Sequence, residues 1–320
     1  MGFPSHEAVD VAYIGGTMRS GSTLVHRMLS RLSGFVSVGE VVHVWERGVS
    51  RNELCGCGAR FHDCPFWMQV GSLAYGGWDR LDLSGVRRLQ RTVDRTRYIP
   101  LMVAARDGAG PYGRALSRYA DLLIRLYGAI REVSGADVVV DSSKHASTAF
   151  LLRRVPGVRL HVVHLVRDSH GVAFSLDRQV PRPEVTGTQA YMPTATPLRA
   201  GLEWVTVNGL FHALRATGVP TTFLKYESLV RQPESEIRRI ARALGMEANL
   251  PAEAVVRDGI VRFPRDHTVS GNPMRFAVGD VVVRPDDAWR RSMPRADRAV
   301  TTALTWPLLA RYGYPLGTRR

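Results

Sequence analysis

A short segment near the N-terminus, residues 15–23 (GGTMRSGST), brings glycines, hydroxyl side chains and one arginine together. Glycines let the backbone turn tightly, so that successive amide N–H groups can point at one anion, and a helix that begins at the turn adds the positive end of its dipole. The arginine adds a fixed positive charge that suits a phosphate oxygen. The sequence therefore predicts a phosphate-binding loop formed by Gly16, Thr17, Arg19, Ser20, Gly21, Ser22 and Thr23.

The position of the cation distinguishes this loop from that of nucleotide triphosphatases. Their loop reads G-x-x-x-x-G-K-[ST], and its lysine reaches the β- and γ-phosphates. Counting from Gly16, the second glycine is Gly21, but Ser22 stands where the lysine would follow, and the cation lies inside the loop at Arg19. A P-loop nucleotide kinase-like phosphotransferase is therefore the weaker alternative.

A second pair of polar residues follows a later predicted strand. Residues 158–168 (VRLHVVHLVRD) have the long apolar run of a strand buried on both faces. The run ends at Arg167, and Ser175 lies eight residues further on, in the predicted helix that follows. Ligands of open α/β sheets bind at the carboxyl ends of the strands, so this pair is placed to bind a second phosphate.

Together the two motifs resemble those of sulfotransferases that use the donor PAPS (3′-phosphoadenosine 5′-phosphosulfate). The segment RSGST, residues 19–23, is similar to the loop that binds the donor's 5′-phosphosulfate in the branch that includes tyrosylprotein and many bacterial enzymes. LVRDSHGVAFS resembles the family's 3′-phosphate motif, with Arg167 and Ser175 in the matching places. The resemblance runs from about residue 11 to residue 292. It implies a P-loop-like fold, PAP as the product, and a hydroxyl acceptor such as a small molecule, phenol, sugar or lipid.

Two later segments add candidates through the same resemblance. Residues 223–246 resemble the strand-to-helix segment that follows the second phosphate site, where Tyr226 is either a nucleotide contact or a packed residue at a strand end. Residues 267–276 (HTVSGNPMRF) resemble the C-terminal nucleotide loop, and Arg275 is the candidate for the 3′-phosphate there.

Sulfuryl transfer requires a base for the acceptor hydroxyl, and fixed cations for the transferring group and the leaving phosphate. Arg19 and the loop N–H groups supply positive charge. Glu40 directly follows the predicted strand 35–39, and its spacing after Arg19 resembles that of the base glutamate in the tyrosylprotein branch. Glu40 is the favoured base, with an ion pair to a loop arginine as its alternative role. His43 and His145 are competing bases.

The segment DSSKHAS, residues 141–147, leaves another predicted strand at the same edge of the sheet. Lys144 is placed there to stabilise the sulfuryl oxygens. Ser142 or Ser143 can donate a hydrogen bond to the same group or cap a predicted helix at 146–153.

Three cysteines, Cys55, Cys57 and Cys64, lie within ten residues, with His62 between them. Free packed thiols are the favoured interpretation, and a local disulfide or a zinc site that includes His62 is the alternative. No metal is assigned to the site. Similar Cys-x-Cys and Cys-Pro-Phe-Trp stretches occur in bacterial sulfotransferases, which suggests a family insertion.

The elements that must position these residues alternate along the chain. Apolar runs predict strands at 11–16, 35–39, 137–141, 158–168 and 221–225. Helical spacing predicts helices at 84–98, 114–133, 146–153, 198–217, 227–244 and 295–312, together with helices after the glycine loop and from about residue 169. This pattern predicts a three-layer α/β fold, a central parallel sheet flanked by helices. One domain over 1–320 is expected, with an irregular Cys- and aromatic-rich insertion at about 45–80. A proline-rich loop at about 181–198 is either a linker or a lid over the site.

Composition narrows the function classes. Hydrophobic residues make up 45% of the chain, enough to form a core, and the formal net charge of +14 suits an anionic ligand. No run of basic residues interleaved with aromatics appears, so a non-catalytic anion- or nucleic-acid-binding protein is disfavoured. No apolar stretch reaches the roughly 20 residues that span a bilayer, and no basic-then-apolar leader begins the chain, so a cytoplasmic enzyme is expected.

Overall fold

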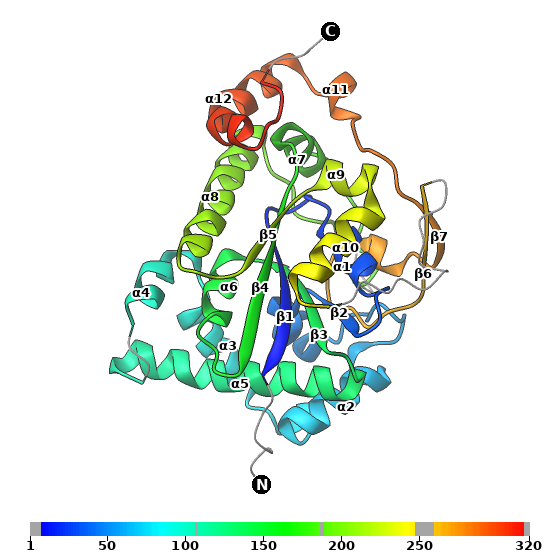
Figure 1. The fold of residues 1–320 in the computed structure, drawn as a ribbon. Coiled ribbons are helices and arrows are strands. Elements are labelled where there is room, and N and C mark those ends of the chain that lie inside the picture. The colour runs from blue at the N-terminus through cyan, green and yellow to red at the C-terminus, as the bar shows by residue number, and fades with distance from the viewer. Residues whose placement is uncertain (1–7, 106–107, 186–188, 247–258, 317–320) are drawn as a thin grey trace.

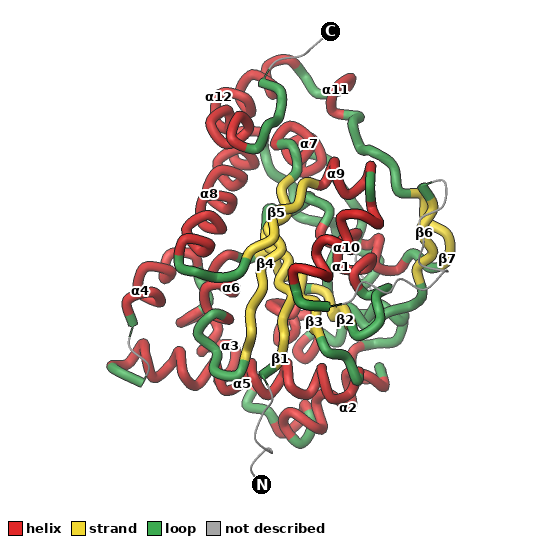
Figure 2. The backbone as a smooth tube through the Cα atoms, in the orientation of Figure 1, coloured by secondary structure: helices red, strands yellow, loops and turns green. Residues whose placement is uncertain are grey.

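A computed structural model describes residues 8–105, 108–185, 189–246 and 259–316 of the chain. Its centre is a sheet of five parallel strands in the order β2-β3-β1-β4-β5. Figure 1 shows the strands as arrows that run in one direction, and Figure 2 shows the same strands between layers of helices. The strands are β1 (Val9–Gly15), β2 (Phe35–Gly39), β3 (Val138–Lys144), β4 (Val158–Val166) and β5 (Thr221–Lys225). The predicted three-layer P-loop-like α/β fold is confirmed.

Alternate residues of β1 enter the cores on the two faces of the sheet, as the period of a strand requires. Val11 and Tyr13 belong to one hydrophobic cluster, whereas Ala12 and Ile14 belong to another. The first cluster is closed by α5 (Gly110–Ser134), α6 (Ala146–Leu152) and α8 (Pro197–Ala216). The second is closed by α1 (Ser22–Leu29), α9 (Tyr226–Arg231) and α10 (Pro233–Ala243). Because both faces are covered, the strands read as continuous apolar runs.

A third cluster lies beyond the carboxyl end of β4. There α7 (Ser169–Leu176) and α8 pack against α11 (Trp289–Ser292) and α12 (Arg295–Arg311). Figure 1 shows α7, α11 and α12 at the top of the molecule and α8 running down beside the sheet. The C-terminal part of the chain therefore supports α7, which carries Ser175 and follows Arg167.

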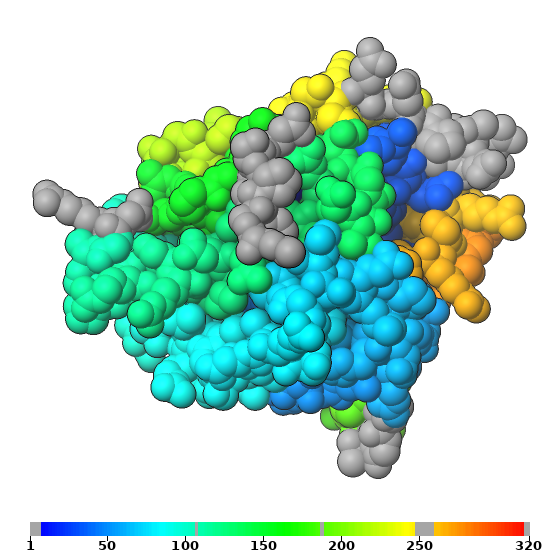
Figure 3. Space-filling model, turned by 90° about the horizontal axis from the view of Figure 1, so that it is seen from below, coloured from blue at the N-terminus to red at the C-terminus, as the bar shows by residue number. Residues whose placement is uncertain are grey.

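The segment after β2 joins the first hydrophobic cluster instead of adding to the sheet. It contains a π-helical stretch (Val44–Ser50), α2 (Pro65–Tyr75), α3 (Leu83–Val93) and α4 (Ile99–Ala104). Figure 3 shows these blue and cyan residues gathered on the lower face of the molecule, beside α5. The prediction of an irregular insertion at 45–80 was wrong for α2, which begins at Pro65 and ends where Gly76 takes a positive φ of 75°.

Several predicted boundaries also differ. The helix expected at 227–244 is two helices, because Pro233 begins α10 and has no N–H with which to continue α9. The helix expected at 84–98 ends at Val93. Strand β3 continues to Lys144, so Ser142 and Ser143 lie in the strand and do not cap α6, whose N-cap residue His145 makes no side-chain cap bond. The sequence analysis also missed an antiparallel pair, β6 (Ile260–Phe263) and β7 (Gly279–Val282).

Within the described ranges, no helix combines the length and the apolar character needed to cross a bilayer.

Candidate active site

A cavity of about 350 Å³ lies at the carboxyl edge of the central sheet. Its walls come from segments that follow every strand, because the carboxyl ends of parallel strands meet at one edge. The predicted residues that line it are Arg19, Gly21, Ser22, Thr23, Glu40, Lys144, Arg167, Ser175 and Tyr226, and both competing bases, His43 and His145, line it as well. The structure thus brings most of the predicted site residues together.

Two glycines give the loop between β1 and α1 its shape. Gly16 has a φ of 151°, and a Cβ at this position would lie 2.3 Å from the carbonyl oxygen of Leu165. Gly21 has a φ of 95°, and its Cβ would lie 2.5 Å from Cδ2 of Tyr226. Both positions need glycine for conformation and for space. The loop backbone can therefore pass close to β4 and α9 before α1 begins at Ser22.

The remaining loop residues fix its interior. Ser20 Oγ donates a hydrogen bond of 2.7 Å to the carbonyl oxygen of Thr17, and both side chains are buried. Thr17 and Ser20 therefore shape the loop from within, whereas Ser22 and Thr23 reach the cavity.

Arg19 combines a left-handed backbone with a buried guanidinium nitrogen that has no partner among the described residues. Its φ of 63° is left-handed, which costs a non-glycine residue roughly 1–2 kcal/mol. Its buried Nη2 has no hydrogen-bond partner among the described residues. Burial lowers the pKa of Arg19, and the positive charge of Arg167 lowers it further. A buried guanidinium nitrogen without a partner is costly, so this position favours an anion.

Arg167 joins the loop to the opposite wall. Its Nη1 donates 3.0 Å to the carbonyl oxygen of Arg19, and its guanidinium lies 4.8 Å from the centre of the Tyr226 ring. Its Nη2 donates 2.8 Å to Oδ2 of Asp286. Ser175 faces the same cavity from α7. Two arginines thus converge where the loop meets β4.

A carboxylate and an ammonium group form a pair across the cavity from the loop. Lys144 Nζ donates a hydrogen bond to Oε1 of Glu40 and a second, of 3.1 Å, to the carbonyl oxygen of Ser142. Burial raises the pKa of Glu40, but Lys144 and then His43 outweigh burial and lower this pKa to about 2. Glu40 is therefore ionised at neutral pH. Lys144 reaches it from a left-handed backbone, with a φ of 68°.

Two histidines lie beside this pair, and His43 is uncharged at neutral pH. His43 Nε2 is 3.5 Å from Oε2 of Glu40, and burial followed by the charge of Arg47 lowers the pKa of His43 to about 3. His145 packs edge-on against His43 with 5.8 Å between ring centres. Each histidine can accept a proton in its neutral form.

Ser143 has a structural role. Its Oγ donates a short hydrogen bond to Asp141 and accepts one of 2.9 Å from the backbone N of Val42. This contact fastens the segment after Glu40 to the end of β3.

Arg275 is not brought to the cavity. Its side chain is 1% exposed, and its guanidinium donates to the carbonyl oxygens of Thr268 at 2.6 Å and Leu54 at 2.8 Å. The cavity instead contains two arginines that the sequence analysis missed, Arg47 and Arg284. The signal for Arg47 was present, since it follows His43 by four residues and so lies on the same side of a helical turn.

The proline-rich loop at 181–198 contributes Met192 and Pro193 to the cavity wall. Part of it, residues 186–188, lies outside the described residues.

Three solved structures and one family model are similar to this chain. The sulfotransferase domain from the curacin biosynthetic pathway is 16% identical, with 98% of this chain and 100% of that domain covered and a TM-score of 0.50. The sulfotransferase domain of the Synechococcus PCC 7002 olefin synthase is 21% identical over 98% of both chains, with a TM-score of 0.47. A sulfotransferase from Alicyclobacillus acidocaldarius is 13% identical over 96% of both chains, with a TM-score of 0.38. No curated relative matches in sequence. A family model, described as the sulfotransferase family, matches residues 12–249, well over half of the 320 residues, and the chain therefore belongs to the sulfotransferase family.

Proposed function

We propose that this sulfotransferase transfers a sulfuryl group from PAPS to a hydroxyl acceptor, with Glu40 as the base. The observation that carries the proposal is the buried Nη2 of Arg19, which has no partner among the described residues. It lies in the loop before α1, in one cavity with the buried Glu40–Lys144 pair. The first feature suits an anionic donor, and the second supplies a carboxylate that can take a proton.

The two ends of the donor would bind to different arginines. The 5′-phosphosulfate fits the loop, because Arg19 and the unpaired N–H groups at the start of a helix bind anions. The 3′-phosphate fits Arg167, supported by Ser175 on α7, and Tyr226 would contact the nucleotide beneath the guanidinium. A triphosphate is a poorer match, because Ser22 replaces the lysine that would reach its terminal phosphates.

In the transfer, the acceptor oxygen bonds to sulfur while the bond from sulfur to the bridging phosphate oxygen breaks, and that oxygen retains the electron pair on PAP. Glu40 accepts the proton of the acceptor hydroxyl and later returns it to water. Arg19 stabilises the charge that develops on the leaving phosphate. Lys144 stabilises the sulfuryl oxygens.

With a pKa of about 2, Glu40 is a weak base as long as Lys144 is bound to it. A movement of Lys144 would remove the main cause of the low pKa of Glu40. When its ammonium turns to the sulfuryl oxygens, Glu40 loses the charge that most lowers its pKa, and burial then raises that pKa. Donor binding would thereby prepare the base.

Uncharged His43, which lies against the same carboxylate, is the competing base, together with His145. The kinetic effects of replacing Glu40 and His43 distinguish the two assignments.

The acceptor would approach through a second cavity of about 560 Å³, which shares Met18, Lys144 and His145 with the first. Leu198 and Leu202 of α8 line it, and both are more than half exposed. This wall favours an acceptor that carries an apolar part beside its hydroxyl. Met192 and Pro193, from the described part of the proline-rich loop, would cover the bound pair.

The test is sulfuryl transfer from radiolabelled PAPS to a panel of phenols, alcohols, sugars and lipids. Glu40→Gln keeps the shape of the side chain and should lower kcat about 10²- to 10⁴-fold. Glu46→Gln is the matched control, because this half-buried glutamate pairs with Arg87 outside the cavity and should leave kcat unchanged. Transfer from ATP instead of PAPS would contradict the donor assignment. A loss of kcat in His43→Gln alone would contradict the choice of base.

A further inference from the structure

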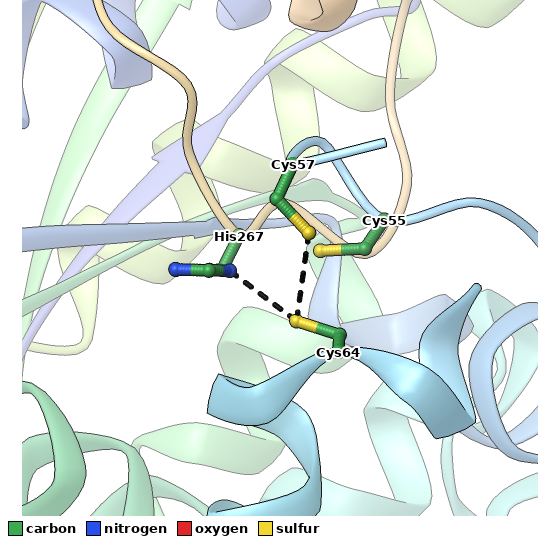
Figure 4. Close-up of side chains that lie close together, drawn as sticks. All are labelled: Cys55, Cys57, Cys64 and His267. Carbon is green, nitrogen blue, oxygen red and sulfur yellow. Dashed lines mark hydrogen bonds between the residues drawn. The ribbon is translucent and has the colours of Figure 1, made fainter. Parts of the chain in front are cut away.

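Four side chains with metal-binding atoms meet beneath the cavity. Cys55, Cys57 and Cys64 come from the segment between the π-helical stretch and α2, and His267 comes from the loop after β6. All four ligand atoms lie within 4.8 Å of one another. Figure 4 shows the three sulfurs and the imidazole pointing into a common space.

The distances between these atoms match those of a tetrahedral site. Zinc binds cysteine sulfur at about 2.3 Å and histidine nitrogen at about 2.0–2.1 Å, so two sulfurs on a tetrahedron lie about 3.8 Å apart, and sulfur and nitrogen about 3.6 Å. Cys57 Sγ and Cys64 Sγ are 3.7 Å apart, and Cys64 Sγ lies 3.3 Å from Nδ1 of His267. One ion therefore fits between them with only small adjustments.

His62, which lies among the cysteines in sequence, has another partner. Its Nε2 contacts the carbonyl oxygen of Val49 at 2.9 Å, and its backbone N donates to Oδ1 of Asn52 at 2.8 Å. The histidine of the cluster is His267, 203 residues after Cys64.

The surrounding contacts hold the ligands in place before any ion binds. A tight turn at the first two cysteines is closed by hydrogen bonds of 2.8 Å between Cys55 and Ala59 and between Gly58 and Cys55. The ring of Phe66 stacks on His267 at 4.9 Å, and Trp67 Nε1 donates 2.8 Å to the His267 carbonyl oxygen. Such outer contacts orient ligands in metal sites.

We propose that Cys55, Cys57, Cys64 and His267 bind one structural Zn²⁺ ion. Three thiolates and one imidazole complete a tetrahedron and leave no open position for substrate, which is the mark of a structural site. Binding releases the three thiol protons and gives a complex with a net charge of −1. The buried guanidinium of Arg275 offsets that charge, because it donates to the carbonyl oxygens of the residues adjoining Cys55 and His267. The sequence favoured free packed thiols and gave a zinc site with His62 as an alternative; the proposal takes up zinc, with His267 in place of His62.

The ion would connect the insertion to the loop that borders the catalytic pair. Three residues after His267, the Ser270 carbonyl oxygen accepts a bond of 3.3 Å from the backbone N of Glu40. Ser270 Oγ accepts 2.7 Å from Arg47 and donates 3.4 Å to Glu40. Zinc would thus fix the backbone that positions Glu40, and its loss would loosen the active site from a distance.

The direct test is the metal content of untagged full-length protein, expressed with zinc in the medium and purified without chelators under reducing conditions. We expect about one zinc per chain by elemental analysis. After zinc removal, Co²⁺ should bind with the thiolate charge-transfer bands and strong visible bands of a tetrahedral site. These readouts need neither donor nor acceptor, so they remain valid if the proposed function fails.

Variants distinguish the histidines. His267→Gln and Cys57→Ser should lose most of the zinc, whereas His62→Gln, the matched control, should retain it. If the ligand variants fail to fold, the zinc content and the cobalt spectrum of the wild-type protein still test whether the site binds zinc.

Wild-type protein that contains no stoichiometric zinc and takes up no Co²⁺ would overturn the proposal. Stoichiometric iron in place of zinc would also overturn it, as would zinc lost in His62→Gln but kept in His267→Gln.

Discussion

Replacing Lys144 by methionine tests the Glu40–Lys144 pair without using catalysis. Both side chains are only 11% exposed, so the substitution leaves a buried carboxylate without its main partner. In the wild-type protein the pKa of Glu40 lies at about 2, against an ordinary value of 4.5. A return to 4.5 corresponds to about 3 kcal/mol, since one pKa unit is about 1.36 kcal/mol. Breaking a buried ion pair typically costs about 3–5 kcal/mol, in agreement with this value.

The pH dependence follows from the direction of the shift. Because the folded-state pKa of Glu40 lies below its unfolded value, the pair stabilises the wild-type fold above about pH 4.5, and this contribution disappears as the pH falls towards 2. In Lys144→Met, the remaining burial raises the pKa of Glu40. The difference in unfolding free energy between wild type and variant should therefore be about 3 kcal/mol at pH 7 and shrink below pH 4.5.

Urea unfolding at pH 7, 5 and 4, followed by tryptophan fluorescence, measures this difference. Lys225→Met is the matched control, because Lys225 is the only other lysine and lies over the Tyr314 ring at 4.7 Å, with no buried carboxylate partner among the described residues. The double variant Glu40→Gln/Lys144→Met should recover part of the loss. A difference that stays constant across this pH range, or an equal effect in Lys225→Met, would refute the pairing.

Three further outcomes follow from the cavity and its support. Asp286→Asn should tighten PAP binding about fivefold, measured by calorimetry at low salt. The substitution removes a half-exposed carboxylate that competes with PAP for Arg167 through a bond worth roughly 1 kcal/mol. Weaker PAP binding in the variant would contradict this competition. Arg275→Met should lower the free energy of unfolding in urea by about 2–4 kcal/mol, because two buried carbonyl oxygens lose their hydrogen-bond donor. An unchanged midpoint of urea unfolding would contradict a structural role for Arg275. Gly21→Ala should weaken PAP binding at least tenfold, because the added Cβ would lie 2.5 Å from the Tyr226 ring. Wild-type affinity for PAP in this variant would contradict the need for glycine at position 21.

Local patterns in the sequence predicted the sheet and most of the cavity. β2 has the predicted bounds, because an apolar run that ends in glycine describes a buried strand without reference to the rest of the chain. The glycine loop was predictable for the same reason. The glycine loop lies between a strand and a helix, and ligands of parallel sheets bind at the carboxyl ends of the strands. Glu40, Lys144 and Arg167, which follow other strands, were therefore expected beside the loop. Lys144 carried one more signal, as one of only two lysines among 43 basic residues.

Long-range pairing was not predictable from one sequence. His267 completes the cysteine cluster from 203 residues away, while the nearer His62 bonds to a backbone carbonyl. Arg275 resembled a phosphate ligand in a suitable loop, yet its guanidinium donates to the carbonyl oxygen of Leu54, 221 residues away. In both cases the role of the side chain depends on which distant backbone segment packs against it. The spacing of residues in the sequence does not indicate which distant segments pack together.

The central claim is that the cavity binds PAPS through Arg167 and the glycine loop. Its most direct test is calorimetric titration of wild type, Arg167→Ala and the exposed helix control Arg91→Ala with PAP and with Mg-ATP. We expect wild type and Arg91→Ala to bind PAP in preference to ATP, and Arg167→Ala to bind PAP about 10- to 100-fold more weakly, as the loss of charged hydrogen bonds predicts. Preference for ATP, no binding of PAP, or unchanged affinity in Arg167→Ala would contradict the account.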